Sequence, residues 1–279
     1  MTVNEAYQLA KGKLKNADID DFCFDCECIF EKATGFSREK RILNSQQSLS
    51  NESTQKLFGM VQRRIDLEPL QYIIGEWDFM DLTFNVGKGV LIPRPETEIL
   101  VDLADELLRQ TSEKVVYDLC AGTGCVGLTI AKHNPNAKVY LFEKYENALR
   151  FTNENLDNLK LSNAKVIKCD ILDGLLGDLQ KPDIIISNPP YIKSDEIKNL
   201  QIEVKNEPLT ALDGGIDGLH FYKAIKEKWA SLLKNDGILI FECGDGQSKD
   251  ILSIFKGISK EEKVIYDFNN IDRVVQIKV

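Results

Sequence analysis

The chain divides into a first part with helical periodicity and a second part in which apolar runs alternate with amphipathic segments. Residues 2 to about 66 carry apolar positions at three- and four-residue spacing, with breaks at 16–20, 35–37 and 44–50, which predicts a small helical bundle. Between residues 70 and 90 the pattern changes to QYIIG, WDFMDLTFNV and GVLIP, short runs that predict β structure with a hairpin. We expect a helical domain at 1–67, a β-hairpin connector at 68–93 and a larger domain at 94–279.

The larger part has the pattern of an α/β domain. After a helix that begins just beyond Pro95, five continuous apolar runs follow: VVYDLC, AKVYLF, AKVIKC, DIIIS and GILIFEC. Helical segments separate them, which predicts a doubly wound, mostly parallel sheet that is covered on both faces. The last two runs, KVIYDF and RVVQIKV, are joined by a short polar turn and predict an antiparallel pair at one edge.

Composition and charge narrow the class of partner. Apolar residues make up 43% of the 279 and charged residues 28%, which is ordinary for a globular protein. With 35 basic and 44 acidic residues the net charge is −9, so the overall field repels phosphate backbones and we expect no direct nucleic-acid partner. The N-terminus lacks a signal-like apolar stretch, and no segment approaches the ~20 apolar residues that span a bilayer. We therefore expect a cytoplasmic protein without membrane contact.

Three of the seven cysteines, Cys23, Cys26 and Cys28, crowd into one short segment. A zinc site needs about four ligands, and no second Cys/His pair with suitable spacing follows. The same segment is also typical of a helix, on which Cys26 and Ile29 share a face with neighbouring phenylalanines. The interpretation that we favour is reduced, partly buried thiols, and we expect no metal.

The segment from Asp118 to Gly127, DLCAGTGCVG, predicts a strand, a glycine turn and the start of a helix. Such a turn lets the backbone approach a nucleotide-like ligand, and Glu143, at the end of the next strand, can hold two ribose hydroxyls. The spacing fits NAD as well as S-adenosylmethionine, and a plain tight turn is the alternative. Asp118 favours S-adenosylmethionine, because its carboxylate suits an ammonium group better than a pyrophosphate.

The segment Ser187-Asn188-Pro189-Pro190-Tyr191 directly follows the fourth apolar run. Two prolines fix the loop and remove two backbone donors, so its carbonyl groups can face a cavity without competing N–H groups. The Asn188 Oδ1 and the Pro189 carbonyl can each accept one hydrogen of an NH₂ group, and Tyr191 offers a flat face to a planar substrate. The alternative is a rigid turn in which Tyr191 only packs.

The two segments together resemble the class I S-adenosylmethionine-dependent methyltransferases that methylate planar NH₂ groups. Three further segments, EPLQYIIGEWDFMDLTFNV (68–86), LIPRPETE (91–98) and NEPLTALDGGIDGLHFYKAI (206–225), resemble the HemK/PrmC family of protein-(glutamine-N5) methyltransferases, and the likeness covers essentially the whole chain. The family acts on peptide chain release factors. The resemblance implies methyl transfer from S-adenosylmethionine to the glutamine side-chain amide of their Gly-Gly-Gln motif, by a monomeric enzyme that modulates translation termination.

The resemblance also implies roles by position. The cofactor loop falls on Cys120, Ala121, Gly122, Thr123 and Gly124, the ribose-binding acid on Glu143, and the adenine-side pair on Asp170 and Ile171. The catalytic and substrate-binding motif falls on Asn188, Pro189, Pro190 and Tyr191, and Asn188 also contacts the cofactor. Thr97 and Glu98 close the methionine end of the cofactor pocket. Two positions depart from the usual pattern of the family: Glu143 stands where Asp is more common, and Cys120 where glycine is.

Three other functions stay open at this point. Glutamine methylation of a ribosomal protein is the nearest. A DNA adenine methyltransferase would share NPPY but needs a basic groove, whereas the second part of this chain is net acidic. An NAD-dependent oxidoreductase would explain the glycines but leaves NPPY and the closing strand pair unexplained.

Amide methylation depends on positioning and needs no strong general base, so we read His133 and His220 as surface or packing residues. We expect the helical domain to recognise the protein partner. A stabilising cap is the alternative.

Overall fold

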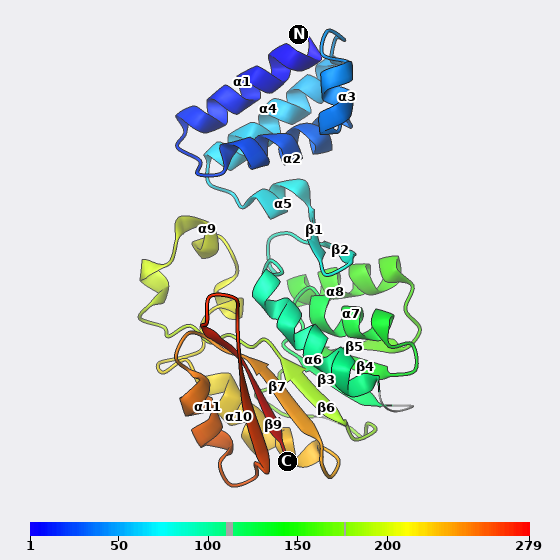
Figure 1. Cartoon of the computed structure of the whole chain (residues 1–279), viewed down its shortest axis with the longest axis vertical. Coiled ribbons are helices and arrows are strands. Elements are labelled where there is room, and N and C mark those ends of the chain that lie inside the picture. The colour runs from blue at the N-terminus through cyan, green and yellow to red at the C-terminus, as the bar shows by residue number, and fades with distance from the viewer. Residues whose placement is uncertain (110–113, 176) are drawn as a thin grey trace. The chain divides into compact units, whose positions relative to one another are not determined.

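A computed structural model describes residues 1–109, 114–175 and 177–279, and they form two compact units (Figure 1). The helical unit comprises residues 1–76 and a short later segment, 201–206. The sheet unit comprises residues 77–200 and 207–279. The segment 201–206 belongs to the loop that follows NPPY, so the chain leaves the sheet unit and returns to it within a few residues.

The helical unit confirms the predicted bundle. Its breaks fall where glycine, asparagine and serine interrupt the pattern, and Ser37 and Ser50 each cap the helix that follows by accepting a backbone N–H. Thr2 and Glu5 form a reciprocal capping box at the first helix. The helices are α1 (Val3–Asn16), α2 (Phe22–Thr34), α3 (Arg38–Leu43), α4 (Asn51–Ile65), α5 (Leu70–Ile74) and α9 (Ile202–Lys205).

A buried cation ties α9 to the bundle. The guanidinium of Arg64 on α4 contacts Asp25 on α2 at 2.6 Å and Glu203 on α9 at 2.6 Å. The side chains of Arg64 and Asp25 are both 6% exposed, so the charges have little water around them and depend on each other. Removing Arg64 would therefore leave a buried carboxylate without its cation.

The connector differs in part from the prediction. The run QYIIG (71–75) was predicted to be extended, but residues 71–74 are helical in α5. The Pro69 carbonyl accepts the first helical N–H groups, and Gly75, at φ +84°, ends the helix. The predicted hairpin is present as β1 (Glu76–Phe79) and β2 (Leu82–Asn85). The run GVLIP is not a strand. Val90, Ile92 and Pro93 are buried within the sheet unit and Leu91 is half-buried, although the run pairs with no strand of the described residues. Burial therefore accounts for the apolar pattern that predicted β structure.

The sheet unit has the predicted α/β order. Among the described residues its large sheet has seven strands: β3 (Val115–Leu119), β4 (Lys138–Glu143), β5 (Ala164–Lys168), β6 (Ile184–Ser187), β7 (Ile238–Glu242), β8 (Glu261–Tyr266) and β9 (Asp272–Lys278). They lie in the order β5-β4-β3-β6-β7-β9-β8, and β3 to β7 pair in parallel. The predicted terminal pair is confirmed, with β9 antiparallel to both β7 and β8.

Two apolar cores cover the two faces of this sheet, because successive strand residues point to opposite faces. Val116 and Ile186 face the core formed with α6 (Glu98–Leu108), α7 (Cys125–His133) and α8 (Glu146–Leu159). Tyr117 and Phe241 face the core formed with α10 (His220–Lys228) and α11 (Ser248–Phe255). The described part of this unit also contains the 3₁₀ turns η1 (Pro95–Thr97), η2 (Ile197–Asn199), η3 (Leu209–Ala211) and η4 (Ala230–Leu232).

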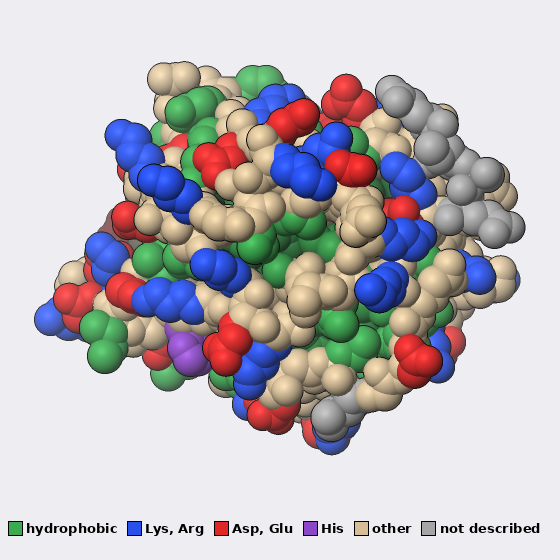
Figure 2. Space-filling view, turned by 90° about the horizontal axis from the view of Figure 1, so that it is seen from below, with side chains coloured by type: hydrophobic (Ala, Val, Ile, Leu, Met, Phe, Trp, Pro, Cys, Tyr) green, Lys and Arg blue, Asp and Glu red, His purple; other side chains and the backbone are tan. Residues whose placement is uncertain are grey.

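The lengths of the described helices and the charges on the face drawn in Figure 2 bear on membrane and nucleic-acid contact. Among the described residues no helix is both long and apolar enough to cross a membrane. Figure 2 shows the molecule from below the view of Figure 1, and basic and acidic side chains are interspersed over this face with hydrophobic side chains between them.

Candidate active site

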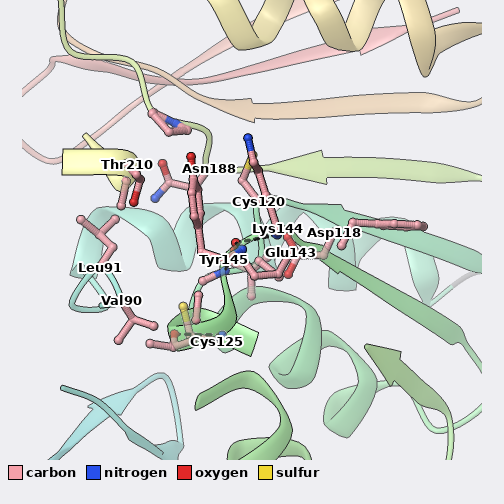
Figure 3. Close-up of a pocket in the computed structure, with 18 of the residues that line it drawn as sticks. Val90, Leu91, Asp118, Cys120, Cys125, Glu143, Lys144, Tyr145, Asn188 and Thr210 are labelled. Atoms are coloured by element: carbon pink, nitrogen blue, oxygen red, sulfur yellow. Dashed lines mark hydrogen bonds between the residues drawn. The ribbon is translucent and has the colours of Figure 1, made fainter. Parts of the chain in front are cut away.

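A pocket opens at the carboxyl ends of the parallel strands. Leu119, Ser187 and Phe241 are neighbours in the register of β3, β6 and β7, so the loops that follow these strands emerge together. The space between the pocket walls, including the open mouth, is about 980 Å³. Figure 3 shows Val90 and Leu91 on one side of it and residues after β3 and β4 on the other.

The glycine loop after β3 turns sharply in the left-handed region. Cys120, Gly122 and Gly124 have φ values of +62°, +59° and +81°. A Cβ on Gly124 would meet Leu128 at 2.8 Å, so this position requires glycine for two reasons. Cys120 does have a side chain there, at a cost of roughly 1–2 kcal/mol relative to glycine. Cys120 can therefore replace the glycine that is usual in the family, but its backbone is strained.

Asp118 anchors the helix behind this loop. Its Oδ2 accepts the N–H of Gly127 at 2.9 Å, and a Cβ on Gly127 would meet that oxygen at 2.7 Å. Burial raises the pKa of Asp118 to about 7, against the opposing effect of the Gly127 N–H. Because Asp118 also lines the pocket, a cationic ligand group nearby would restore its ionised form.

Glu143 shapes the loop and faces the pocket. Its Oε2 accepts the N–H of Gly122 at 2.9 Å, and its Oε1 accepts those of Lys144 and Tyr145 at 2.7 and 2.9 Å. Burial raises the pKa of Glu143 although these three N–H groups oppose the shift. Each carboxylate oxygen has two lone pairs, so Oε2 can still accept a ligand hydroxyl.

Asp170 and Ile171 lie on the same wall as Glu143. Burial opposes ionisation of Asp170, but the Lys144 ammonium at 2.7 Å and the Leu172 N–H outweigh it, so the pKa of Asp170 lies below its ordinary value. The carbonyl of Ile171 accepts the indole N–H of Trp229 at 2.8 Å. Both predicted adenine-side residues are thus held in place by side chains outside the loop.

The NPPY segment contributes Asn188 and Pro190 to the pocket wall. Asn188 Nδ2 donates to Thr97 Oγ1 at 3.2 Å, and Thr97 lines the pocket as well. Pro189 and Tyr191 are not part of the wall: Pro189 is buried, and the Tyr191 hydroxyl donates to Glu242 Oε1 at 3.3 Å. The roles predicted for Pro189 and Tyr191 stay predictions.

The loop 213–218 packs directly against NPPY. A Cβ on Gly214 would meet Tyr191 Cα at 2.7 Å, and one on Gly218 would meet the Tyr191 carbonyl oxygen at 2.5 Å. Gln247 Nε2 donates to the same carbonyl at 2.9 Å. Two glycines therefore allow the close approach that holds Tyr191 in place.

Two buried acids that support the site were not predicted. Glu207 accepts the Ile92 N–H at 2.9 Å and binds the Arg94 guanidinium. Glu242 accepts the Thr97 hydroxyl at 2.6 Å. Glu242 could have been predicted from the sequence, because it is an acid at the end of an apolar strand, at the same edge of the sheet as Glu143. No pattern of this kind marks Glu207 in the sequence.

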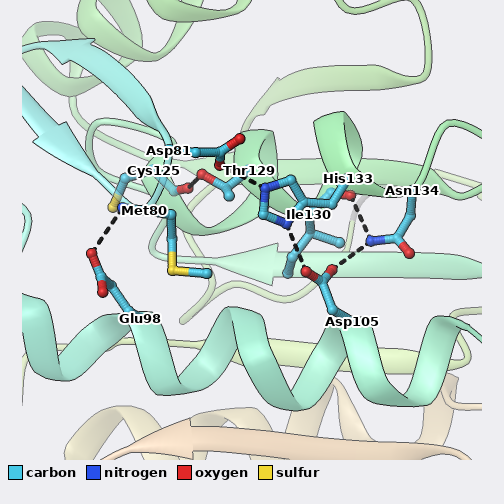
Figure 4. A network of polar contacts seen from close by, with 9 residues as sticks. All are labelled: Met80, Asp81, Glu98, Asp105, Cys125, Thr129, Ile130, His133 and Asn134. Atoms are coloured by element: carbon cyan, nitrogen blue, oxygen red, sulfur yellow. Dashed lines mark hydrogen bonds and ion pairs between the residues drawn. The ribbon is translucent and has the colours of Figure 1, made fainter.

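Other candidate residues lie away from the pocket. Glu98 accepts the Met80 N–H at 2.8 Å in the hairpin turn and does not line the pocket. His133, at the end of α7, bridges Asp105 at 2.6 Å and Asp81 at 2.8 Å (Figure 4). It is therefore a packing residue within an ion network.

The remaining histidine and the cysteine cluster are peripheral. His220 is exposed at the start of α10. Cys23 is exposed, Cys26 buried and Cys28 half-buried along α2. No group of three His, Cys, Asp or Glu side chains within 1–109, 114–175 and 177–279 is arranged to hold a metal.

Several known methyltransferases are similar to this chain in sequence or in fold. Residues 96–208 match the methyltransferase small domain family, and residues 5–75 match the PrmC N-terminal domain family. The release factor glutamine methyltransferase of Thermodesulfovibrio yellowstonii is 41% identical over 81% of this chain and 82% of that protein. The one of Clostridium acetobutylicum is 34% identical over 99% of this chain and 98% of that protein. The hMettl16 catalytic domain has a similar fold, with a TM-score of 0.56 at 17% identity, over 84% of this chain and 85% of that one.

The fold and the pocket together define a class I methyltransferase that uses S-adenosylmethionine. The identity to these relatives and the share of the chain that they cover identify the family within this class. It belongs to the release factor glutamine methyltransferase family, the HemK/PrmC family that the sequence resembles.

Proposed function

We propose that this protein transfers a methyl group from S-adenosylmethionine to the side-chain amide nitrogen of the glutamine in the Gly-Gly-Gln motif of peptide chain release factors. The observation that carries the proposal is the orientation of Asn188. Its Nδ2 is engaged by Thr97, and its Oδ1 accepts no hydrogen bond from the residues that the structure describes. An acceptor without a partner in the pocket wall suits a substrate NH₂ group.

The residues of the pocket fit S-adenosylmethionine. Glu143 has acceptor capacity for ribose hydroxyls, Asp118 suits an ammonium group, and Asp170 with Ile171 would hold the adenine side. When bound, this cofactor supplies a methyl group on a positively charged sulfur. The glycine loop lets the backbone come close to it, which explains why Gly122 and Gly124 precede the helix.

The chain's own contribution to the reaction is mainly positioning. An amide nitrogen is a poor nucleophile, because its lone pair is delocalised into the carbonyl group. Asn188 Oδ1 would accept one of its hydrogens, orient the nitrogen and stabilise the positive charge that develops there. The second hydrogen is assigned to the Pro189 carbonyl by the sequence motif alone, because Pro189 does not line the pocket. A proton then leaves the nitrogen to water or to the Asn188 carbonyl, so no strong base is required.

The helical unit is proposed to recognise the release factor, with 1–67 as the recognition domain, 68–93 as the connector and 94–279 as the methyltransferase domain. The match of residues 5–75 to the PrmC N-terminal domain family supports treating this unit as a domain with a role of its own. A pocket that admits one glutamine side chain cannot by itself select one protein among many with exposed glutamines. We place the activity in the cytoplasm, where release factors act, and assign it to a monomer.

Mass spectrometry of a purified release factor tests the proposal. After incubation with this protein and S-adenosylmethionine, the Gly-Gly-Gln peptide should gain the mass of one methylene group. Purified ribosomal proteins, incubated in parallel, test the nearest alternative. Methylation of a ribosomal protein with an unchanged release factor would contradict the assignment.

Two Asn188 variants test the role of the pocket. Asn188→Ala should lower the rate by roughly 10²- to 10³-fold while S-adenosylhomocysteine affinity stays within a few-fold, because one preorganised contact to the transition state is lost. Asn188→Asp keeps the size but adds a negative charge, which should strengthen cofactor binding and slow turnover. Near-normal turnover in either variant would show that NPPY is not the acceptor site.

A further inference from the structure

A continuous chain of hydrogen bonds runs from the pocket wall into the protein. Asn188 Nδ2 donates to Thr97 Oγ1 at 3.2 Å, and Thr97 Oγ1 donates to Glu242 Oε2 at 2.6 Å. The other oxygen of Glu242 accepts the Tyr191 hydroxyl at 3.3 Å. Glu242 is 3% exposed and does not line the pocket, so it acts on a ligand there through Thr97, which does line it.

The direction of these hydrogen bonds follows from the chemistry of each group. An ionised carboxylate only accepts, and a threonine hydroxyl has a single hydrogen. When Glu242 is ionised, that hydrogen goes to Glu242, and the hydroxyl oxygen can only accept from Asn188. The Asn188 amide must then present Nδ2 to Thr97, which turns its Oδ1 the other way.

We propose that Glu242 is a positioning residue, whose carboxylate selects through Thr97 the Asn188 orientation in which Oδ1 is available to the substrate amide. The inference rests on the proposed function, in which Asn188 Oδ1 accepts a hydrogen from the glutamine NH₂ group. A neutral group at position 242 can donate to Thr97. The Thr97 hydroxyl hydrogen is then free to bind Asn188 Oδ1, which requires the Asn188 amide to flip. The flipped amide turns Nδ2, a donor, toward the substrate NH₂ group, which is also a donor.

The surroundings of Glu242 set the pH at which this selection holds. Burial raises the pKa of Glu242 to about 7, while the hydrogen bonds from Thr97 and Tyr191 and the charge of Arg273 lower it and that of Glu96 raises it. The other titratable groups that interact with Glu242 are Cys125, Tyr222 and Cys243, whose own pKa values burial keeps high. Since these thiols and phenols stay neutral, Glu242 is the member of this group that changes charge near neutral pH.

Activity of the full-length protein on an intact release factor provides the first test. Glu242→Gln keeps the shape but removes the obligate acceptor, and kcat should fall about 100-fold, as for other displaced positioning contacts. KM and the Kd of S-adenosylhomocysteine should stay within about threefold, since neither ligand touches position 242. Thr97→Val should lower kcat similarly, and Thr97→Ser, which keeps the hydroxyl, should recover most of the loss. Thr129→Val, on α7, controls for loss of a buried hydroxyl.

The pH profile separates positioning from a merely structural role. At saturating cofactor, wild-type kcat should rise with pH through about 7 as Glu242 ionises, and this rise should disappear in Glu242→Gln. Asp118 titrates in the same range, and a rise that persists in Glu242→Gln would assign it to Asp118 and overturn the proposal. This comparison uses Glu242→Gln alone, so it decides the question even if Thr97→Val does not fold.

A substrate-free measurement distinguishes failure of this inference from failure of the proposed function. The ¹⁵N side-chain amide resonances of Asn188, assigned by their absence in Asn188→Ala, should shift with pH near 7 in the wild type and not in Glu242→Gln. If that shift is seen but no release factor is methylated, the proposed function fails and the positioning stands. If methylation requires Asn188 while Glu242→Gln retains wild-type kcat and resonances, the inference is wrong.

Discussion

The carboxylate of Glu207 holds the guanidinium of Arg94 and also accepts the backbone N–H of Ile92 at 2.9 Å. The Glu207 side chain is 2% exposed and that of Arg94 34%, so the acid is the buried partner. The contact joins segments 91–98 and 206–225, each of which contributes to the pocket wall. These segments are more than a hundred residues apart in the sequence, and a single buried carboxylate fixes one against the other.

Loss of Arg94 should destabilise the fold more than loss of the Glu207 charge. Arg94→Met leaves Glu207 buried with only the Ile92 N–H, and the free energy of unfolding should fall by about 1–3 kcal/mol. Glu207→Gln keeps an acceptor for Ile92 and removes the buried charge, so its cost should be smaller. Urea denaturation measures both, with Arg109→Met as an exposed control. Equal effects of Arg94→Met and Arg109→Met would show that the pair contributes nothing.

Glu143→Ala should weaken S-adenosylhomocysteine binding by about 1–3 kcal/mol, because a charge-assisted hydrogen bond to the ribose is lost. The loop N–H groups of Gly122, Lys144 and Tyr145 also lose their acceptor. Isothermal titration measures the affinity, and Glu146→Ala, at a largely exposed neighbouring acid, is the control. Tight binding of NAD without binding of S-adenosylhomocysteine would contradict the assignment of this pocket.

His133 should stabilise the sheet unit mainly at mildly acidic pH. Burial disfavours its charge, but the hydrogen bonds to Asp81 and Asp105 outweigh this, so the pKa of His133 is raised in the fold. A raised pKa means that the stabilisation is complete below the unfolded value, about 6.5, and is lost as the pH rises through the folded value. The pKa of Asp81 is lowered by the same contact, so its contribution is lost as the pH falls below about 4.

The measurement is the difference in unfolding free energy between the wild type and His133→Gln as a function of pH. The advantage of the wild type should be largest between roughly pH 4 and 6.5 and should shrink towards pH 9. A difference that stays constant over this range would mean that His133 contributes only by packing.

A chain that begins at Leu67 should still bind S-adenosylhomocysteine, because no residue of the pocket wall precedes Gly89. Its kcat/KM on an intact release factor should fall much more than that on a short Gly-Gly-Gln peptide, since partner recognition is lost. The truncation also removes Asp25 and Arg64, the partners of segment 201–206. Arg64→Met in the full chain is therefore the matched control. Equal losses on protein and peptide would identify the helical unit as a stabilising cap.

Much of the architecture could be read from local pattern. Continuous apolar runs marked the strands of the sheet, because a strand buried on both faces has no polar side to show. The glycine turn after β3 and the proline loop after β6 could be predicted from their residue types, since left-handed turns favour glycine and loops without N–H donors need proline. The prediction that QYIIG is extended was wrong, because its β-branched and aromatic residues also pack well in the short helix α5, which Pro69 precedes and Gly75 follows.

The order of the strands along the chain and the chemical character of the loops between them follow from the sequence alone, because both depend on residues that are neighbours in the chain. The pairing of Thr97 with Glu242, 145 residues apart, was decided only by the tertiary structure. The same holds for Glu207 with Arg94. A buried carboxylate is stable only where a distant donor meets it, and that meeting depends on how the sheet, the loops and the helices pack together.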